Sequence, residues 1–318
     1  MIKVGSDFSG VGAFNQALIR LGIEYEEIFA CDMDKFARKT FIENYGEPKY
    51  FPKDVYEREI PEESLDLYMA SPPCQSFSLA GKRLGKKDER GVLFFNSHEF
   101  IKKNKPKYFI FENVKGLLSH DLGKTFSEWL NLLSGKSING LPVLFPYENS
   151  VPYHIYYKVL NPTDFGVPQN RERIFIVGIR DDENNFFRFP KSIYSSKTLQ
   201  DCLEENAKEK YCLSDKMVKY ISITRHGESK LILNRTIANC ISCTIRKMQR
   251  SSVDNYVNYY ENGIKTNRIR KLTPRECFRL MDFPESFKWT CSDSQAYMQA
   301  GNSIVVKMLE LIIKKLDL

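Results

Sequence analysis

The stretch IKVGSDFSGVGAF, residues 2–14, predicts a short apolar strand, a tight glycine-containing loop and the start of a helix. Glycines at such a turn let the backbone bend sharply and approach a ligand closely. Asp32 ends the next apolar run, the position from which a carboxylate accepts hydrogen bonds from ribose hydroxyls. Asn15, however, stands where the dinucleotide fingerprint has its third glycine. We therefore expect a site for an adenosine-containing cofactor without a pyrophosphate, and a nicotinamide-dependent oxidoreductase is disfavoured.

Short apolar runs alternate with helix-like stretches through the first half of the chain. Strands are predicted at residues 2–8, 27–31, 65–70, 108–111, 155–160 and 173–179, and helices at 13–21 and 93–102. This alternation argues for an α/β fold with a doubly wound, mostly parallel sheet that has ligand sites at the carboxyl ends of its strands. Asp7, Asp32, Cys74 and Glu112 each follow a predicted strand closely, so we expect them at that edge.

The alternation stops beyond Phe189. From about residue 190 to residue 270 the composition shifts to Ser, Asn, Tyr and Lys with few apolar periods, which predicts a second, smaller domain. Helix signals return at TPRE, residues 273–276, with an N-cap Thr, a Pro at the first helical position and a Glu three residues after the cap. The apolar spacing over 303–316 predicts an amphipathic helix packed on a sheet. We therefore expect domains at 1–189 and 190–270, and a return to the first domain over 271–318.

The composition indicates a globular protein, since 42% of the 318 residues are hydrophobic. No run of about 18 apolar residues and no signal-peptide pattern is present, so we expect a cytoplasmic location and no membrane contact. In that compartment the eight cysteines stay reduced. Cys240 and Cys243 form a single C-x-x-C, whereas zinc sites usually combine two such pairs, and we predict no metal.

The net charge of +7 arises from one part of the sequence. Between Arg225 and Lys271 there are ten lysines and arginines against three acidic residues, so the rest of the chain is balanced. Positive charge concentrated in this way suits a polyanion, most directly nucleic acid. A solvated lysine-rich face would give the same count.

Three further stretches carry reactive or charged side chains. SPPCQSFS, residues 71–78, holds Cys74 behind two prolines that stiffen the backbone, although a structural cysteine would fit there as well. FENV places Glu112 at the end of an apolar strand, where a carboxylate is either paired or functional. PQNRER brings Arg171 and Arg173 just before a strand, so the two guanidinium groups could point the same way and bind a carboxylate, a phosphate or a base carbonyl.

Taken in order, these stretches resemble the motifs of the DNA (cytosine-5)-methyltransferase family. DFSGVGAF resembles the first motif, SPPCQSFS the catalytic loop, FENV the glutamate motif and PQNRER the arginine motif, while KLTPRECFRLMDFP and YMQAGNSIVV resemble the last two. The resemblance covers nearly the whole chain and implies the adenosylmethionine-dependent methyltransferase fold. It also implies a bacterial modification enzyme whose partner is a restriction endonuclease acting on the same DNA sequence. A monomer could contain the entire site.

The resemblance implies a role for each polar residue at the sheet edge. Cys74 would add to carbon 6 of a cytosine that has been flipped out of duplex DNA. Glu112 would hold the N3 edge of that ring and Arg173 its carbonyl at carbon 2, with Arg171 in the same motif as a further candidate.

The implied methyl donor is S-adenosyl-L-methionine, which leaves as S-adenosyl-L-homocysteine. Phe8 would stack on its adenine, Asp32 would bind its ribose, and Gly10 and Gly12 would keep the loop clear for the methionine part. The full set of implied cofactor contacts is Phe8, Gly10, Gly12, Asp32, Met33, Asp54, Val55, Pro73, Leu93, Asn302 and Ser303. Met33 stands where many members have an aromatic residue, and Ala13 replaces the second of two adjacent glycines, so cofactor affinity could differ.

The resemblance also implies how DNA is held. The basic stretch AGKRLGKKDERG, residues 80–91, resembles the family's loop that closes over DNA, and residues 190–270 correspond to its target-recognition region. The implied nucleic-acid contacts are Ser78, Lys82, Arg83, Arg90, Thr244, Ile245, Arg246, Lys247 and Arg250. Two alternatives remain open from the residues alone: a tRNA cytosine methyltransferase of the same family, and a catalytically silent nucleic-acid-binding relative.

Overall fold

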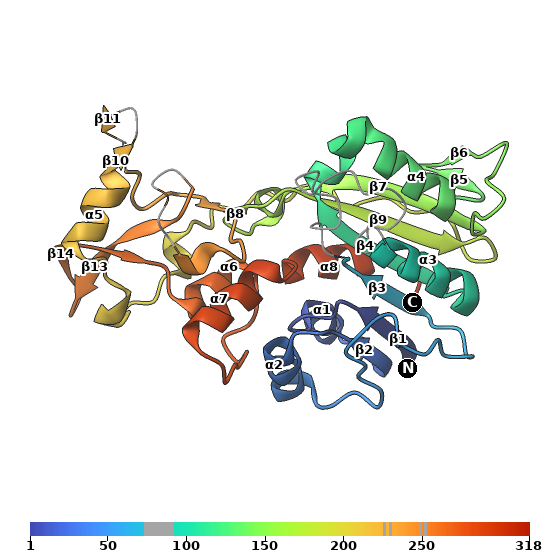
Figure 1. Ribbon diagram of the computed structural model, residues 1–318, viewed down its shortest axis with the longest axis horizontal. Coiled ribbons are helices and arrows are strands. Elements are labelled where there is room, and N and C mark those ends of the chain that lie inside the picture. Colours follow the sequence, from blue (N-terminus) through green and yellow to red (C-terminus); the bar gives the residue numbers. More distant parts are fainter. Residues whose placement is uncertain (73–91, 225–226, 229–230, 248–249, 251–252) are drawn as a thin grey trace. The chain divides into compact units, whose positions relative to one another are not determined.

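A computed structural model gives the structure of residues 1–72, 92–224, 227–228, 231–247, 250 and 253–318 (Figure 1). The chain forms two compact units. Unit 1 comprises residues 1–160, 172–191 and 309–318, and unit 2 comprises residues 161–171 and 192–308. The change of unit at residue 192 lies close to the predicted boundary at 190. Residues 161–171 and 271–308, which we expected in the first domain, pack within unit 2 instead.

Unit 1 is built on an eight-stranded sheet with the order β2-β1-β3-β4-β9-β7-β5-β6. The strands are β1 Ile2–Asp7, β2 Tyr25–Cys31, β3 Leu67–Ala70, β4 Tyr108–Val114, β5 Ser137–Ile138, β6 Leu141–Pro142, β7 Tyr153–Leu160 and β9 Arg173–Arg180. Strands β2, β1, β3 and β4 pair in parallel, whereas β9 runs antiparallel between β4 and β7. The sheet confirms the predicted fold class.

The helices of unit 1 alternate with its strands. They are α1 Ala13–Arg20, α2 Lys35–Tyr45, α3 Val92–Asn104, α4 Lys124–Leu133 and the end of α8 Val306–Ile313. The sequence did not single out α2 and α4. The start of α2 has a local cause, because the Asp34 side chain accepts hydrogen bonds from the N–H groups of Phe36 and Ala37.

Aromatic side chains fill the core between the sheet and helices α3 and α4. Phe94 of α3 stacks on Trp129 of α4 with ring centroids 3.9 Å apart. Phe100, two turns along α3, stacks on Tyr68 of β3 at 4.3 Å. These offset and stacked rings bury large apolar areas, so α3 lies against the strand that leads to the SPPC segment.

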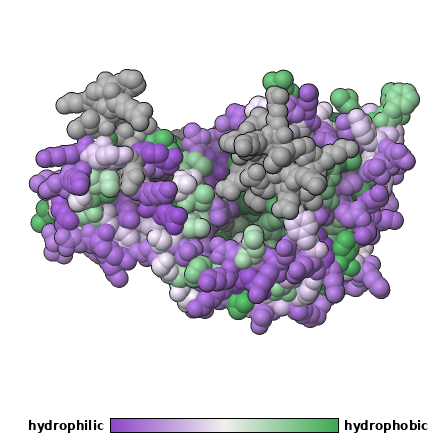
Figure 2. Space-filling model, viewed as in Figure 1, coloured by the Kyte–Doolittle hydropathy of each residue, from purple (hydrophilic) through white to green (hydrophobic). Residues whose placement is uncertain are grey.

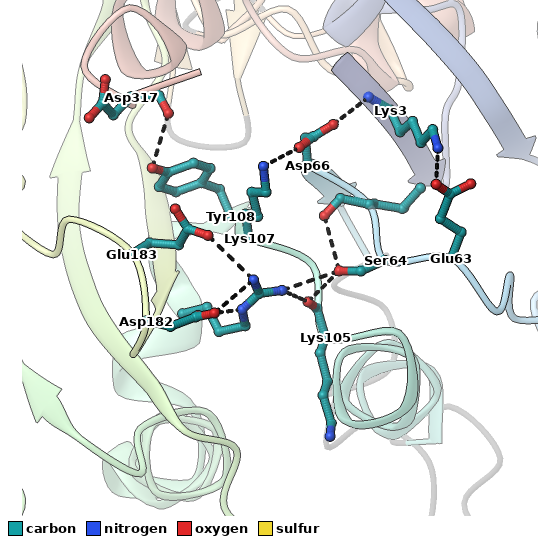
Figure 3. A network of polar contacts seen from close by, with 12 residues as sticks. Lys3, Glu63, Ser64, Asp66, Lys105, Lys107, Tyr108, Asp182, Glu183 and Asp317 are labelled. Atoms are coloured by element: carbon teal, nitrogen blue, oxygen red, sulfur yellow. Dashed lines mark hydrogen bonds and ion pairs between the residues drawn. The ribbon is translucent and has the colours of Figure 1, made fainter. Parts of the chain in front are cut away.

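The amino-terminal edge of the parallel strands is closed by a network of paired charges (Figure 3). Asp66 accepts a hydrogen bond from the main-chain N–H of Lys3 at 2.7 Å and forms an ion pair with Lys107 at 2.8 Å. Tyr108 donates to the main-chain oxygen of Asp317 at 3.1 Å, which ties the carboxyl-terminal segment to β4. This edge is therefore a structural one, whereas Asp7, Asp32 and Glu112 lie at the opposite, carboxyl edge of the strands.

Unit 2 is an assembly of short elements. They are the 3-10 helices η3 Pro162–Phe165, η4 Gln200–Cys202, η5 Glu209–Tyr211 and η6 Ile245–Lys247, the helices α5 Asp215–Ser222, α6 Pro274–Leu280 and α7 Asp293–Asn302, and the strands β8 Gln169–Asn170, β10 Ile223–Thr224, β11 Gly227–Glu228, β12 Ala238–Asn239, β13 Tyr256–Glu261 and β14 Ile264–Lys271. On the face shown in Figure 2, hydrophilic residues predominate, with apolar residues in small groups among them.

Two sets of contacts explain why residues 161–171 and 271–308 belong to unit 2. Strand β8 pairs in parallel with β12, so the segment before β9 is hydrogen-bonded within unit 2. Helix α6 begins with the predicted capping box between Thr273 and Glu276, which confirms that signal. The same Glu276 forms a fully buried ion pair with Arg270 at the end of β14, at 2.7 Å. The cap therefore ties α6 to unit 2 and not to the first domain.

The C-terminal helix is shorter than its apolar pattern predicts, since α8 covers Val306–Ile313 within the predicted 303–316. No helix among the residues that the structure covers is long and apolar enough to cross a membrane.

The buried Glu27 on β2 predicts how the free energy of unfolding depends on pH. Its carboxylate accepts hydrogen bonds from Asn15 of α1 at 3.0 Å, and burial raises the pKa of Glu27 from 4.5 to about 7. Because the folded protein disfavours the ionised form, the contribution of Glu27 to stability is largest below pH 4.5 and declines as the pH rises to about 7. We expect Glu27→Gln to gain up to about 3 kcal/mol of unfolding free energy relative to the wild type across this range, measured by urea denaturation.

Glu24→Gln is the control, because Glu24 is exposed and precedes the same strand. Equal pH profiles for the wild type and Glu27→Gln would contradict the expectation.

Candidate active site

An ion pair between Glu112 and Arg173 lies at the carboxyl edge of the parallel strands. Arg173 is the first residue of antiparallel β9, and β4 ends beside it, so their side chains come together diagonally on one face. The Arg173 Nε lies 3.0 Å from Glu112 Oε1. Glu112 is 6% exposed, so its carboxylate is nearly dry. The two charged groups can therefore bind adjacent polar atoms of a single small ring.

The segment that leads to Cys74 is tied to the same strand. Ser71 donates its hydroxyl to Glu112 Oε2 at 2.7 Å, and Asn113 donates its side-chain amide to the main-chain oxygen of Pro72 at 3.1 Å. Strand β4 thus holds both the carboxylate and the stem of the SPPC segment. The hydrogen bonds of Ser71 and Asn113 were not predicted from the sequence, although both residues lie within the quoted motifs.

Several predicted residues lie outside the described part of the chain. These are Pro73, Cys74, Ser78, Lys82, Arg83 and Arg90, and their predicted roles stay predictions.

The glycine loop after β1 has the geometry of a ligand-binding turn. Phe8 has a positive φ of 58°, which is strained for a residue with a side chain, and its ring packs against the core cluster. Gly10 has a φ of 55°, and a Cβ there would meet only the Phe8 carbonyl oxygen at 4.0 Å. The main chain at Gly10 therefore stays open to an approaching ligand.

Asp32 holds this loop in place. Its carboxylate accepts hydrogen bonds from the N–H of Gly10 and the N–H of Asp34, both at 2.8 Å. Burial raises the pKa of Asp32, and these two N–H donors oppose the rise. Each carboxylate oxygen keeps a second lone pair with which it could accept a ribose hydroxyl.

The other predicted cofactor residues of unit 1 differ in their surroundings. Met33 is 84% exposed, and Asp54 is exposed at the tip of its turn, where it accepts a hydrogen bond from the N–H of Tyr56 at 3.0 Å. Val55 belongs to the core cluster against which Phe8 and Leu93 pack. Val55 thus lies in the core cluster of unit 1 and Phe8 and Leu93 border it, and their predicted adenine contacts stay predictions.

Gly12 has a packing role that the sequence did not predict. It caps α1 with a φ of 82°, and a Cβ there would lie 2.2 Å from the ring of Tyr45 on α2. The contact shows that this glycine lets α1 and α2 approach each other. Only Gly10 of the two has the open surroundings expected of a loop kept clear for the cofactor.

A buried triad joins β1 to the turn that carries Asp54 and Val55. Arg58 forms two hydrogen bonds to Asp7, at 2.8 and 3.0 Å, and Tyr68 donates its hydroxyl to the same carboxylate at 2.6 Å. All three side chains are buried. Because Asp7 directly precedes Phe8, the triad connects two stretches of the predicted cofactor site. The sequence pattern predicts Asp7 at the strand end but does not indicate that Arg58 and Tyr68 are its partners.

Arg171 and Arg173 do not share partners, contrary to the expectation that they point the same way. Strand β9 begins only at Arg173, so the two-residue alternation of a strand does not extend to Arg171. The guanidinium of Arg171 is buried in unit 2 and donates to the main-chain oxygens of Gly301 at 3.0 Å and Ser303 at 2.8 Å. These contacts give Arg171 a structural place, and its predicted catalytic role stays a prediction.

The predicted cofactor residues of unit 2 lie at the end of α7. Asn302 is exposed, whereas Ser303 is buried and forms the C-cap of the helix. The helix end therefore presents the Asn302 side chain to solvent while the following main chain is held by Arg171.

The predicted nucleic-acid contacts of unit 2 also include both exposed and buried residues. Thr244, Arg246 and Lys247 are exposed, while Ile245 is 2% exposed and anchors η6. Arg250 is held by Asp254, with Nη2 and Oδ1 3.0 Å apart, so its charge is already compensated. Two exposed cations of the predicted set, Arg246 and Lys247, remain on η6.

Ion pairs formed in the tertiary structure compensate some of the positive charges that were counted along the sequence. Among the described residues of this segment, Arg250, Arg268 and Arg270 meet carboxylates, in the pairs Arg250–Asp254, Arg268–Glu209 and Arg270–Glu276. Glu209 and Glu276 lie outside the counted segment, which is why the sequence count overstated the free positive charge. Among the residues with described positions, no group of three or more His, Cys, Asp or Glu side chains is arranged to hold a metal ion.

Comparison with known proteins agrees with this edge of polar residues. The model of the C-5 cytosine-specific DNA methylase family matches residues 2–317. The chain belongs to this family. That membership confirms the predicted family and enzyme class of this C-5 cytosine-specific DNA methylase.

Individual relatives of the methylase are similar over almost its whole length. The Type II methyltransferase M.HaeII of Haemophilus aegyptius is 36% identical, over 96% of this chain and 89% of its own. The Type II methyltransferase M.SsoII of Shigella sonnei is 34% identical, over 97% and 78%. The crystal structure of a Spodoptera frugiperda DNMT2 mutant superimposes with a TM-score of 0.75 at 21% identity, over 99% of both chains, which shows a shared fold.

The Asp7–Arg58–Tyr68 triad predicts the effect of removing one buried charge. We expect Arg58→Met to lower the free energy of unfolding by about 3–5 kcal/mol, because Asp7 would be left as a buried charge without its cation. The double variant Asp7→Asn, Arg58→Met should recover most of this loss, since no buried charge remains. Urea denaturation measures both, and equal stability of the single and double variants would contradict the charge argument.

Proposed function

We propose that this methylase transfers a methyl group from S-adenosyl-L-methionine to carbon 5 of cytosine in a specific duplex DNA sequence. The observation that carries the proposal is the pairing of Glu112 with Arg173 at 3.0 Å beside the stem of the SPPC segment. N3 and the oxygen on carbon 2 are adjacent on a cytosine ring, so two groups that meet at this distance can bind both at once. Glu112 would share a proton at N3, and Arg173 would donate to the oxygen.

The proposed chemistry begins with the Cys74 thiolate, which forms a bond to carbon 6 of the ring. The electron pair displaced from the carbon 5–carbon 6 bond is drawn toward the side of the ring that Glu112 and Arg173 hold, and carbon 5 becomes nucleophilic. Preorganised charges of this kind stabilise the electron-rich ring without reorganisation. Once carbon 5 carries the new methyl group, loss of its proton restores the double bond and expels Cys74.

The donor would supply an electrophilic methyl group when bound. The residues of unit 1 fit its adenosine part: Phe8, Val55 and Leu93 provide an apolar cluster, Asp32 provides free lone pairs, and Gly10 leaves its main chain open. Asn302 and Ser303 in unit 2 would complete the set.

The DNA would lie against η6, where Arg246 and Lys247 are exposed, with the target base taken out of the stack to reach Cys74. Similarity to Type II methyltransferases supports a role in modifying host DNA against a restriction endonuclease that reads the same sequence. We propose that the enzyme acts as a monomer in the bacterial cytoplasm, with residues 190–270 reading the target.

A trapping experiment tests the proposed nucleophile. Duplex DNA with 5-fluorocytosine at the target should form a denaturation-resistant adduct with the protein, because fluorine cannot leave as a proton does. Denaturing gel electrophoresis should show the adduct in the wild type and none in Cys74→Ala. An adduct that persists in Cys74→Ala would rule out this thiol, and Cys291→Ala is the matched control that should still react.

The nature of the nucleic acid is decided by a labelling experiment. With labelled S-adenosyl-L-methionine, we expect label in unmethylated duplex DNA and none in total tRNA. Label confined to tRNA would support the alternative enzyme of the same family, and label in neither would support the silent relative. Bisulfite sequencing of DNA from cells that express the protein then identifies the methylated sequence.

The charge distribution on η6 predicts a salt effect. Replacing Arg246 and Lys247 by Gln should reduce the slope of log affinity against log salt by about 0.9 per lost phosphate contact. Arg250→Gln should change the slope less, because Asp254 already compensates that charge. Lys265→Gln removes an equally exposed charge from β14 and serves as control; an equal fall in that variant would place the DNA elsewhere.

A further inference from the structure

Arg171 lies at the junction of two segments of unit 2. We define the recognition loop as residues 240–247 and the α7 terminus as residues 299–303. Nη2 of Arg171 donates to the carbonyls of Gly301 and Ser303 in the α7 terminus, at 3.0 and 2.8 Å. Nη1 donates to the carbonyl of Ile241 and lies 3.4 Å from the Sγ of Cys240, both in the recognition loop. One buried side chain thus joins both segments.

The chemistry at the helix end explains why an arginine stands here. The last carbonyls of a helix have no partner within the helix, and they carry the negative end of its dipole. A guanidinium is always charged and offers several N–H donors in one plane, so it can bind two carbonyls of α7 and still donate to a third group. Lysine has one compact ammonium group and cannot reproduce this planar arrangement.

Gly301 brings the same two segments into direct contact. It lies within α7, and a Cβ built there would be 2.2 Å from the carbonyl carbon of Ser242 and 2.3 Å from the nitrogen of Cys243. Both are main-chain atoms, which cannot rotate away as a flexible side chain can. The recognition loop therefore rests on the helix without an intervening side chain.

Strand β8, which directly precedes Arg171, supports the loop from a second point. Gln169 accepts a hydrogen bond from the N–H of Ile241 at 2.9 Å and donates to the carbonyl of Leu280 at 2.7 Å. Strand β8, which contains Gln169, pairs with β12 immediately before the recognition loop. The position of the recognition loop is therefore defined by hydrogen bonds on both sides of Ile241.

We propose that Arg171 is a positioning residue that couples target recognition to cofactor binding. The role rests on the proposed function, which assigns Thr244 to Lys247 to DNA and Asn302 with Ser303 to the cofactor. A shift of the recognition loop on binding DNA moves carbonyls that share one guanidinium with the α7 terminus, so it changes the cofactor contacts. Such coupling is reciprocal: DNA changes the affinity for the cofactor by the same factor as the cofactor changes the affinity for DNA.

Calorimetry measures this coupling directly. The dissociation constant of S-adenosyl-L-homocysteine, which cannot react, is measured with and without a duplex that carries the sequence identified by bisulfite sequencing. We expect the duplex to tighten wild-type binding at least tenfold, and less than twofold in Arg171→Gln and in Gly301→Ala. Arg171→Lys should recover little, because one ammonium cannot hold all three carbonyls.

Arg279→Gln is the matched control. Its guanidinium also donates to two main-chain carbonyls of unit 2, those of Cys202 and Leu203, at 3.2 and 2.9 Å, but it contacts neither segment. Loss of this arginine should lower stability and leave the coupling factor unchanged. Hydrogen exchange should increase in the recognition loop and the α7 terminus together in Arg171→Gln, and in neither in Arg279→Gln.

The outcomes separate the two proposals. A wild type that binds neither S-adenosyl-L-homocysteine nor duplex overturns the proposed function and this role with it. A wild type that binds both without coupling, or an Arg171→Gln variant that keeps the coupling, overturns the role of Arg171 alone. If Arg171→Gln does not fold, Arg171→Lys decides the question, because lysine keeps the buried positive charge and loses only the planar set of N–H donors.

Discussion

The antiparallel pairing of β9 with β4 is the constraint on which the candidate site depends. Parallel strands alone would bring only carboxyl ends to this edge of the sheet. Because β9 runs the other way, its first residue, Arg173, enters beside the last residues of β4 and reaches Glu112. The pairing also sets the point where the chain passes from unit 2 into unit 1, directly after Arg171. Two arginines of one short motif consequently serve different units.

Buried charges recur through the structure, and each has its compensation close at hand. Arg58 meets Asp7, Arg270 meets Glu276, and Arg171 meets the carbonyls at the end of α7. An unpaired charge in such places would cost several kcal/mol, whereas a paired one holds separate segments at a fixed geometry. The contacts of Arg58 and Arg171 join stretches far apart in sequence, whereas Arg270 and Glu276 join the neighbouring elements β14 and α6. They explain how short, irregular elements such as those of unit 2 keep a defined arrangement.

The two edges of the large sheet show a division between stability and chemistry. At the amino-terminal edge, Lys107 compensates Asp66 and Glu63 compensates Lys3, while the main-chain N–H of Lys3 donates to Asp66 (Figure 3). At the carboxyl edge, the glycine loop, Asp32 and the Glu112–Arg173 pair combine strained backbone, burial and open main-chain atoms. Strained backbone of this kind persists where the surrounding contacts hold it, and here Asp32 binds the N–H of Gly10 while the Phe8 ring packs against the core cluster.

The sequence by itself determined β1, β2, β3, β4, β7 and β9, a mostly parallel sheet, the α6 cap and the ordered motifs, because period-two and period-3.6 patterns and capping residues act over a few neighbours. Only the tertiary structure decided that Gly12 faces Tyr45, that Arg58 and Tyr68 hold Asp7, and that Arg171 binds α7 and not the predicted catalytic site. It also decided how much of the basic segment is free, since Glu209 and Glu276 reach it from elsewhere in the sequence. Each of these facts depends on which distant residue is the partner, and local sequence patterns do not identify that residue.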